Sequence, residues 1–203
     1  AYPDDGIVGE EHAPKTGSTG YTWVIDPIDG TSNFINGMPA WVVVIAIVKD
    51  DATQIGVIHD PIHQETYEAT LGKGALLNGK PLICPADTAM NRGSIGVGYC
   101  TRVSKSATLQ VAEQVLAHDG VFHRNGSGAL SLAYVAAGRL IGWVEGHMNA
   151  WDCLAGQLIT AEAGGRVEVQ SANDMITNGG RVVVASAGVF DDLVTIADAA
   201  FGD

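Results

Sequence analysis

The chain has 203 residues, and its 46% hydrophobic content is enough to bury the core of one compact unit. It carries 23 Asp and Glu against 11 Lys and Arg, which gives a formal net charge of −12. Such a charge repels the phosphates of nucleic acids and anionic membrane surfaces, so neither is expected as a partner. A phosphorylated substrate would need a bound cation to offset the same repulsion.

The cysteines indicate a reducing compartment. Cys84, Cys100 and Cys153 are odd in number, lie far apart and form no Cys-x-x-Cys pair, so we expect free thiols. The longest apolar run, residues 40–48, is far too short to span a bilayer, and no charged leader with an apolar core opens the chain. We therefore predict a cytoplasmic protein without a membrane segment.

The first predicted strand, Ile7 and Val8, leads into two adjacent acids, Glu10 and Glu11. Neighbouring side chains in extended backbone point to opposite faces, so only one of the two glutamates can face a given site. On these residues alone, a solvated acidic pair is the default interpretation. Residues 12–20 are rich in Gly, Ser, Thr and Pro and predict a surface loop.

The stretch from Trp23 to Phe34 has the most unusual chemistry in the chain. Pro27 holds Asp26 in an extended conformation and lacks a backbone N–H, so we predict that the strand ends at Asp26. Asp29 follows in a turn, and two acids this close repel each other unless a cation lies between them. Mg²⁺ accepts carboxylate and backbone carbonyl oxygens, so it fits such a site. A tight turn with an N-cap is about equally favoured on these residues alone.

The next segment predicts a largely antiparallel sheet. Residues 41–48 form a β-branched run that is typical of a long central strand. Shorter strands are expected over residues 54–59, 65–70 and 75–77, and Asn78-Gly79 is a hairpin signal.

The second half alternates predicted strands and helices, which indicates layers of both around a mixed core. A strand is expected over residues 94–100, and Ser104 can cap a helix that runs to about Asp119. Gly120 should end this helix. Its apolar face is predicted at Leu109, Ala112, Val115 and Leu116.

Three further positions can contribute to a site. Residues 126–128, Gly-Ser-Gly, open a predicted helix, and free N–H groups at a helix start attract anions, although loop closure alone also explains such a turn. Glu145 ends a strand predicted over residues 140–145. Asp152 precedes a helix predicted over residues 153–163, where a plain N-cap is its simplest role.

Three blocks of this sequence resemble those of the inositol monophosphatase family, within the wider group of fructose-1,6-bisphosphatases and bisphosphate nucleotidases. They occur in the family's order and extend over nearly the whole chain. The blocks are Asp-Pro-Ile-Asp-Gly-Thr at residues 26–31 with Asn33 and Phe34, Gly-Glu-Glu at 9–11, and Trp-Asp at 151–152 with Ala-Gly at 155–156 and Glu-Ala-Gly-Gly at 162–165.

The resemblance implies an α/β fold of the αβαβα sandwich type, which commonly pairs as a homodimer. We expect residues 1–203 to form one catalytic domain of this type, without the two N-terminal helices that family members carry. Those helices help to close the family's site. Gly128 stands where the family usually has Ala, and His123 stands where many bacterial members have Arg.

The resemblance also implies a site with two or three Mg²⁺ ions. The implied ligands are Glu10, Asp26, the Ile28 carbonyl, Asp29 and Asp152. Glu10, Asp29 and Thr31 are the implied catalytic residues, and Glu10 and Thr31 would position the attacking water. The phosphate and its alcohol are expected to contact the ligand residues Glu10, Ile28, Asp29 and Asp152, and beyond these Gly30, Thr31, Gly126, Ser127, Gly128 and Glu145.

The resemblance favours a small phosphorylated metabolite as the substrate. Inositol 1-phosphate comes first, because Asn33 after Gly-Thr-Ser matches the inositol monophosphatase form of the motif. Histidinol phosphate, 3′(2′),5′-bisphosphate nucleotides and fructose 1,6-bisphosphate are alternative substrates. A regulatory or partner-binding protein that keeps the fold is the alternative from another class.

Overall fold

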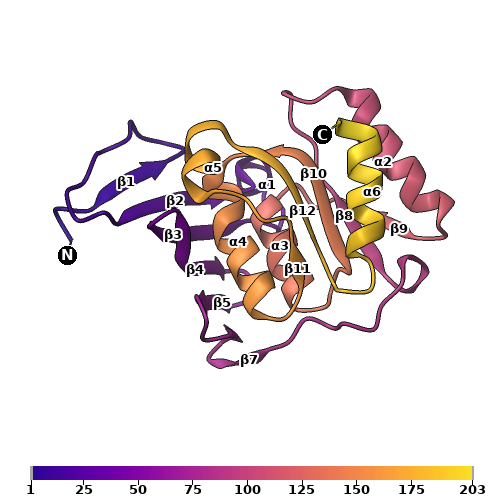
Figure 1. Ribbon diagram of the computed structural model, residues 1–203, viewed down its shortest axis with the longest axis horizontal. Coiled ribbons are helices and arrows are strands. Elements are labelled where there is room, and N and C mark those ends of the chain that lie inside the picture. The colour runs from indigo at the N-terminus through magenta and orange to yellow at the C-terminus, as the bar shows by residue number, and fades with distance from the viewer. Residues whose placement is uncertain (1, 203) are drawn as a thin grey trace.

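Two β-sheets, with helices between them and on one outer side, make up the computed structural model, which describes residues 2–202 (Figure 1). The first sheet has seven strands in sequence order, and all its pairings are antiparallel except that between the first two. Its strands are β1 (Gly6–Gly9), β2 (Thr22–Asp29), β3 (Val42–Lys49), β4 (Ala52–Asp60), β5 (Glu65–Thr70), β6 (Ala75–Leu77) and β7 (Lys80–Leu82).

The second sheet has five strands in the order β11-β12-β10-β8-β9. β10 pairs in parallel with β8 and antiparallel with β12, and the pair of β8 and β9 is parallel. Its strands are β8 (Ser94–Val97), β9 (Val121–His123), β10 (Gly142–Met148), β11 (Arg166–Val167) and β12 (Gly180–Ala185).

Helices α3 and α4 lie between the two sheets, while α2 and α6 cover the outer face of the second sheet (Figure 1). The described residues thus supply the β, α, β and α layers of an αβαβα sandwich, and the predicted α/β fold class is confirmed. The helices are α1 (Thr31–Ile35), α2 (Lys105–Ala117), α3 (Gly128–Ala136), α4 (Ala150–Glu162), α5 (Ala172–Asn178) and α6 (Phe190–Phe201), with one 3₁₀ turn at Met90–Arg92.

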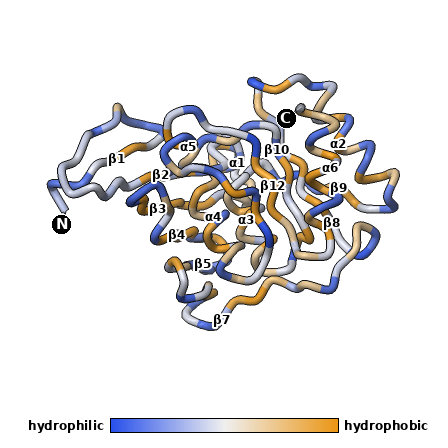
Figure 2. The backbone as a smooth tube through the Cα atoms, in the orientation of Figure 1, coloured by the Kyte–Doolittle hydropathy of each residue, from blue (hydrophilic) through white to orange (hydrophobic). Residues whose placement is uncertain are grey.

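The core lies mainly between the sheets, where Figure 2 shows hydrophobic segments gathered in the strands and central helices. In β3 every second residue from Val42 to Val48 is buried, as expected for a strand with one face on the core. α3 is apolar nearly all round because both sheets and α4 surround it. Within residues 2–202, no helix is both long and apolar enough to cross a membrane.

Two predicted strand ends, those of β2 and β10, were wrong. β2 does not stop at Asp26 but continues to Asp29, and its register with β3 shifts between these two residues. Pro27 has no N–H for the ladder, so the pairing breaks there and resumes with Asp29 opposite Val42. β10 likewise extends to Met148, which places Glu145 inside the strand rather than at its end.

The predicted strand over residues 94–100 ends early, at Val97, because the chain then leaves the sheet as a loop. This loop of residues 98–104 runs from β8 to α2. The helix that follows is capped as predicted, since the Ser104 hydroxyl accepts the Ala107 N–H at 3.2 Å.

The predicted apolar face of α2 was only partly right. Val115 is fully buried as predicted, but Leu109 and Leu116 are 68% and 54% exposed, and the fully buried Val111 was not predicted. α2 packs against β8 and α6 with a narrow stripe, and the two leucines lie on the other side of the helix. The chain leaves the helix through Asp119, which has a φ of 57°, and the predicted Gly120 follows it.

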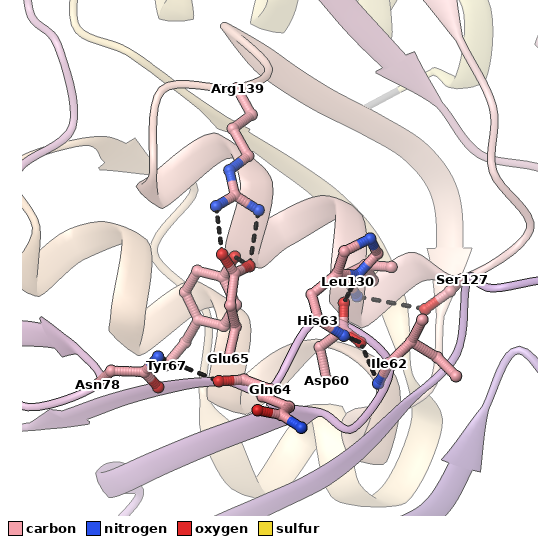
Figure 3. A network of polar contacts seen from close by, with 10 residues as sticks. All are labelled: Asp60, Ile62, His63, Gln64, Glu65, Tyr67, Asn78, Ser127, Leu130 and Arg139. Carbon is pink, nitrogen blue, oxygen red and sulfur yellow. Dashed lines mark hydrogen bonds and ion pairs between the residues drawn. The ribbon is translucent and has the colours of Figure 1, made fainter.

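A polar network joins the β4–β5 hairpin to the end of α3 (Figure 3). Arg139 donates two hydrogen bonds to the Glu65 carboxylate, at 2.7 and 2.6 Å. The hydroxyl of the fully buried Tyr67 donates to the same carboxylate at 2.6 Å. In the hairpin turn, buried Asp60 accepts two backbone N–H groups and contacts His63. The network therefore fixes the hairpin to the central helix layer.

Replacing Glu65 with alanine should lower the free energy of unfolding by about 1–3 kcal/mol, because the buried Tyr67 hydroxyl loses its acceptor. Urea unfolding followed by tryptophan fluorescence measures this loss. Glu65→Gln keeps an acceptor oxygen and should cost less than the alanine variant. Equal losses for the two variants would show that the Tyr67 hydroxyl does not depend on Glu65.

Candidate functional site

The end of β2 places two carboxylates beside the start of α3. Asp26 is 1% exposed, and its Oδ1 accepts the Ile28 N–H at 2.8 Å in a turn around Pro27. Asp29 is 9% exposed and accepts the Ala129 N–H at 2.8 Å through Oδ2. The Ser127 hydroxyl donates to the same oxygen. The N-terminal turn of α3 therefore holds Asp29 in one orientation.

A third carboxylate comes from the first turn of α4. Asn149 is the N-cap of this helix and Asp152 is its third residue, so the plain N-cap role considered for Asp152 is wrong. The Asn149 side-chain amide donates to Oδ2 of Asp152 at 3.3 Å. Asp152 is thereby directed back toward the start of the helix, where the helix dipole favours a negative charge.

The three carboxylates meet at one point between the sheets. One oxygen from each of Asp26, Asp29 and Asp152 lies within 4.8 Å of the others, so the group can hold a metal ion. Burial raises the pKa of all three carboxyl groups, and the charge of Asp29 raises the pKa of Asp26 and Asp152 further. Three like charges this close together and poorly exposed to water are unfavourable unless a cation or protons compensate them. Carboxylate oxygens at this spacing fit a hard divalent cation.

Glu10 lies at the edge of this cluster. Gly9 pairs with Ile25 in the parallel pair of β1 and β2, so Glu10 emerges beside Asp26. Its exposed carboxylate does not belong to the group of three, yet its charge raises the pKa of both Asp26 and Asp152. Its role as a ligand stays a prediction.

The predicted phosphate-contacting turn lies directly after β2. The Thr31 hydroxyl donates to the Ile28 carbonyl at 3.0 Å, and α1 begins at Thr31. Gly30 has a φ of 93°, and a Cβ there would lie 2.8 Å from a backbone carbonyl oxygen, so the turn requires glycine. The buried Asn33 amide donates to carbonyls of two other loops at 2.6 and 2.7 Å, which fixes the turn.

A cavity of ≈ 330 Å³ opens beside the carboxylates, within the size range of small-molecule sites. The structure brings together here most of the residues expected to contact substrate. Those that line the cavity are Asp29, Gly126, Ser127, Gly128, Glu145 and Asp152. Burial raises the pKa of Glu145 to about 7, although the charge of Arg124 lowers it in part. This group can therefore be charged or neutral near pH 7.

Other residues that line the cavity were not predicted from the sequence. Gly98, Arg102, Arg124, His147 and Asn149 also line it. The loop 98–104 reaches the site only because β8 pairs with β10, and no local motif signals that pairing. A Cβ at Gly98 would overlap the Glu145 carboxylate, so this glycine makes room for it.

The departure at Gly128 has a local explanation. A Cβ at this position would lie 2.7 Å from the terminal methyl of Met148. The methionine therefore fills the space that an alanine methyl would take. At the second departure, Arg124 rather than His123 lines the cavity. All three cysteines are free thiols, as predicted.

The layered fold and the carboxylate cluster define an α/β protein with a candidate metal site beside a small-molecule cavity. The model of the inositol monophosphatase family matches residues 1–199, and the chain belongs to this family.

Its relatives carry two kinds of name. The Nus factor SuhB of Haemophilus influenzae is 36% identical over 96% of this chain and 74% of its own length. Among solved structures, the extragenic suppressor protein suhB of Bartonella henselae has a TM-score of 0.88 and 31% identity, over 97% of this chain and 78% of that one. The inositol monophosphatase of Anabaena has a TM-score of 0.87 and 28% identity, over 98% of this chain and 80% of that one.

Proposed function

We propose that the protein is a Mg²⁺-dependent phosphatase that hydrolyses a small phosphate monoester, with inositol 1-phosphate as the first candidate. The observation that carries the proposal is the meeting of Asp26, Asp29 and Asp152 within 4.8 Å beside a cavity of ≈ 330 Å³. Membership of the inositol monophosphatase family supports the same chemistry.

The carboxylates of Glu10, Asp26, Asp29 and Asp152, with the Ile28 carbonyl, would hold two or three Mg²⁺ ions. Bound Mg²⁺ supplies positive charge that stabilises the phosphate and the leaving oxygen and makes water a better nucleophile. This charge also offsets the net charge of −12 that would otherwise repel the substrate.

The chain's own groups orient the reactants. The Thr31 hydroxyl donates to the Ile28 carbonyl, so its oxygen lone pairs are free to accept a hydrogen bond from the attacking water, which Glu10 would hold from the other side. The first N–H groups of α1, near Gly30 and Thr31, have no partner within the helix and would bind phosphate oxygens.

The other end of the cavity would hold the leaving alcohol. Glu145 lies inside β10 and is nearly buried, so its oxygens can accept hydrogen bonds from substrate hydroxyls in a region poor in water. Gly126, Ser127 and Gly128 form another part of the cavity wall. A polyol such as inositol suits an acceptor of this kind, because its hydroxyls can donate to Glu145.

A phosphate-release assay tests the proposal. The full chain is incubated with inositol 1-phosphate, histidinol phosphate, fructose 1,6-bisphosphate or adenosine 3′,5′-bisphosphate, with Mg²⁺ or with EDTA. We expect Mg²⁺-dependent release of phosphate from inositol 1-phosphate. Faster release from another member of the panel would reassign the substrate, and no release from any of them would contradict a phosphatase.

A second candidate function is regulation through a protein partner. It is favoured by the 36% identity to a relative named as a Nus factor. This role predicts no Mg²⁺-dependent release in the same assay, so one experiment separates the two functions. A homodimer and a cytoplasmic location remain predictions, and sedimentation of the purified chain tests the first.

A further inference from the structure

Five of the six arginines of the chain fall into two groups. Arg139, Arg166 and Arg181 form ion pairs with carboxylates at 2.5–2.8 Å. Within residues 2–202, Arg102 and Arg124 have no carboxylate oxygen within 4.0 Å, yet both line the cavity beside the carboxylate cluster. The chain has a net charge of −12, so acidic partners outnumber the basic side chains. Two arginines that line one cavity without an acidic partner among the described residues therefore indicate a role at that cavity.

Arg102 is held in place without being neutralised. Its guanidinium donates to the Asn149 Oδ1 at 2.7 Å and to the Nε2 of His147. Both acceptors are uncharged, because an Nε2 that accepts a hydrogen bond carries no proton. Burial and the charge of Arg102 lower the pKa of His147, which favours this neutral form. The guanidinium therefore keeps its full charge and has further N–H groups for a ligand.

Arg124 is held more loosely on the neighbouring wall. Its guanidinium donates to the Tyr99 carbonyl at 3.5 Å, and its charge lowers the pKa of Glu145 without a direct ion pair. Arg124 comes from the loop between β9 and α3, and Arg102 from the loop 98–104. Two loops that are separate in sequence thus bring positive charge to one cavity.

The reacting phosphate does not require this second source of positive charge. In the proposed function, that phosphate lies on cations held by Asp26, Asp29 and Asp152. Arg124 instead lies near Glu145 and Gly126, where the leaving alcohol is expected. A guanidinium recognises carboxylate and phosphate oxygens through paired N–H donors.

We propose that Arg102, assisted by Arg124, is a specificity-determining residue that selects substrates whose leaving group carries a second anionic group, a carboxylate or a phosphate. The inference rests on the proposed function, and among small phosphate monoesters it ranks those with a second anionic group above inositol 1-phosphate. The neutral supports from His147 and Asn149 preorganise Arg102 for that anion, so little side-chain freedom is lost on binding.

A purely structural role for Arg102 makes a different prediction. Arg102 contacts Asn149, and Asn149 donates to Asp152 at 3.3 Å, so the arginine could act only by orienting a candidate metal ligand. Loss of that support would lower kcat for every substrate by the same factor and raise the Mg²⁺ concentration required. Recognition of a second anion would instead act mainly on KM, and only for substrates that carry the anion.

Matched substrate pairs separate these roles in the full chain. Glycerol 2-phosphate and 2-phosphoglycerate differ by a carboxylate, and inositol 1-phosphate and inositol 1,4-bisphosphate differ by a phosphate. We expect Arg102→Gln to lower kcat/KM for the anionic member of a pair about 10- to 100-fold more than for its neutral partner, as expected for a lost charge-assisted hydrogen bond. The pair that responds identifies the anion.

Two further variants complete the test. Arg102→Lys keeps the charge and should restore part of the preference. Arg92→Gln removes an exposed arginine that does not line the cavity and should not change the preference. Equal losses for both members of each pair with Arg102→Gln would overturn the inference while leaving the phosphatase intact.

The inference can also be tested if the chain releases no phosphate. Calorimetric titration with 2-phosphoglycerate and with glycerol 2-phosphate, in Mg²⁺, measures binding alone. Weaker binding of only the acid by Arg102→Gln would support the selectivity. Identical affinities of the unmodified chain for the two compounds would contradict it.

Discussion

Asp29→Asn should reduce Mg²⁺-dependent phosphate release by at least about 10²–10³-fold while the protein stays folded. Asp29 belongs to the cluster of three carboxylates, and its charge raises the pKa of both Asp26 and Asp152. An asparagine oxygen can still accept the Ala129 N–H, which lies at 2.8 Å in the parent protein. The substitution thus removes negative charge needed for cations and preserves the contact with α3.

The chain offers a matched control for this experiment in Asp60. It is 1% exposed and accepts two backbone N–H groups, at 2.9 and 3.0 Å, as a buried acid outside the cluster. Asp60→Asn should therefore retain turnover within a few-fold, and circular dichroism should show folded protein for both variants. Activity of Asp29→Asn equal to that of the parent would remove Asp29 from the proposed metal site.

Much of the site could be predicted because its key residues are local in sequence. A strand interrupted by a proline and carrying two acids is predicted from Asp26, Pro27 and Asp29. The structure places the register shift of β2 between the two aspartates. Strand pattern was equally informative for β5 and β6, whose bounds of 65–70 and 75–77 match the prediction. The alternation of apolar and polar residues and the glycines of hairpin turns are both signals that lie close together in sequence.

The rest depended on contacts between distant segments. The approach of Arg102 and Gly98 to Glu145 follows from the pairing of β8 with β10, which no periodicity reveals. α5 escaped prediction because seven residues with two Asn and one Asp carry little apolar period. The apolar stripe of α2 was predicted only in part, because the helix has apolar residues on two sides and its packing on α6 and the second sheet selects one of them.

Gly128 shows how a departure from a family pattern can be read only in three dimensions. The terminal methyl of Met148 lies where an alanine Cβ would clash with it, and Trp143 donates to the Met148 sulfur at 3.3 Å. The methionine is therefore fixed beside the cavity by a residue of its own strand. The Met148 methyl thus takes the place of an alanine methyl in the wall of the cavity.

Without divalent cations, the melting temperature should fall as the pH rises from about 6 to about 8, and Mg²⁺ should remove most of this dependence. The folded-state pKa values of Asp26 and Asp152 lie above the ordinary value for aspartate, and that of Glu145 is about 7. The folded protein therefore binds more protons than the unfolded chain in this range. Stability is lost as these groups ionise with rising pH, since repulsion and desolvation then act on buried charges.

The expected size follows from proton linkage. Each proton released contributes about 1.4 kcal/mol per pH unit, which corresponds to about 3–5 °C per pH unit for a chain of this length. Mg²⁺ binds the ionised cluster and replaces the protons, so its stabilising effect should be larger at pH 8 than at pH 6. Thermal unfolding in EDTA and in Mg²⁺, at constant ionic strength, measures both effects.

Asp152→Asn separates this linkage from general effects of pH on the protein. The variant removes one of the repelling charges while keeping an oxygen that can accept from Asn149, which donates to Asp152 at 3.3 Å in the parent. Its melting temperature in EDTA should vary less between pH 6 and pH 8, and Mg²⁺ should raise it less at pH 8. A parent protein whose melting temperature ignores both pH and Mg²⁺ would show that the three carboxylates do not repel one another in solution, and the metal site would then lose its physical basis.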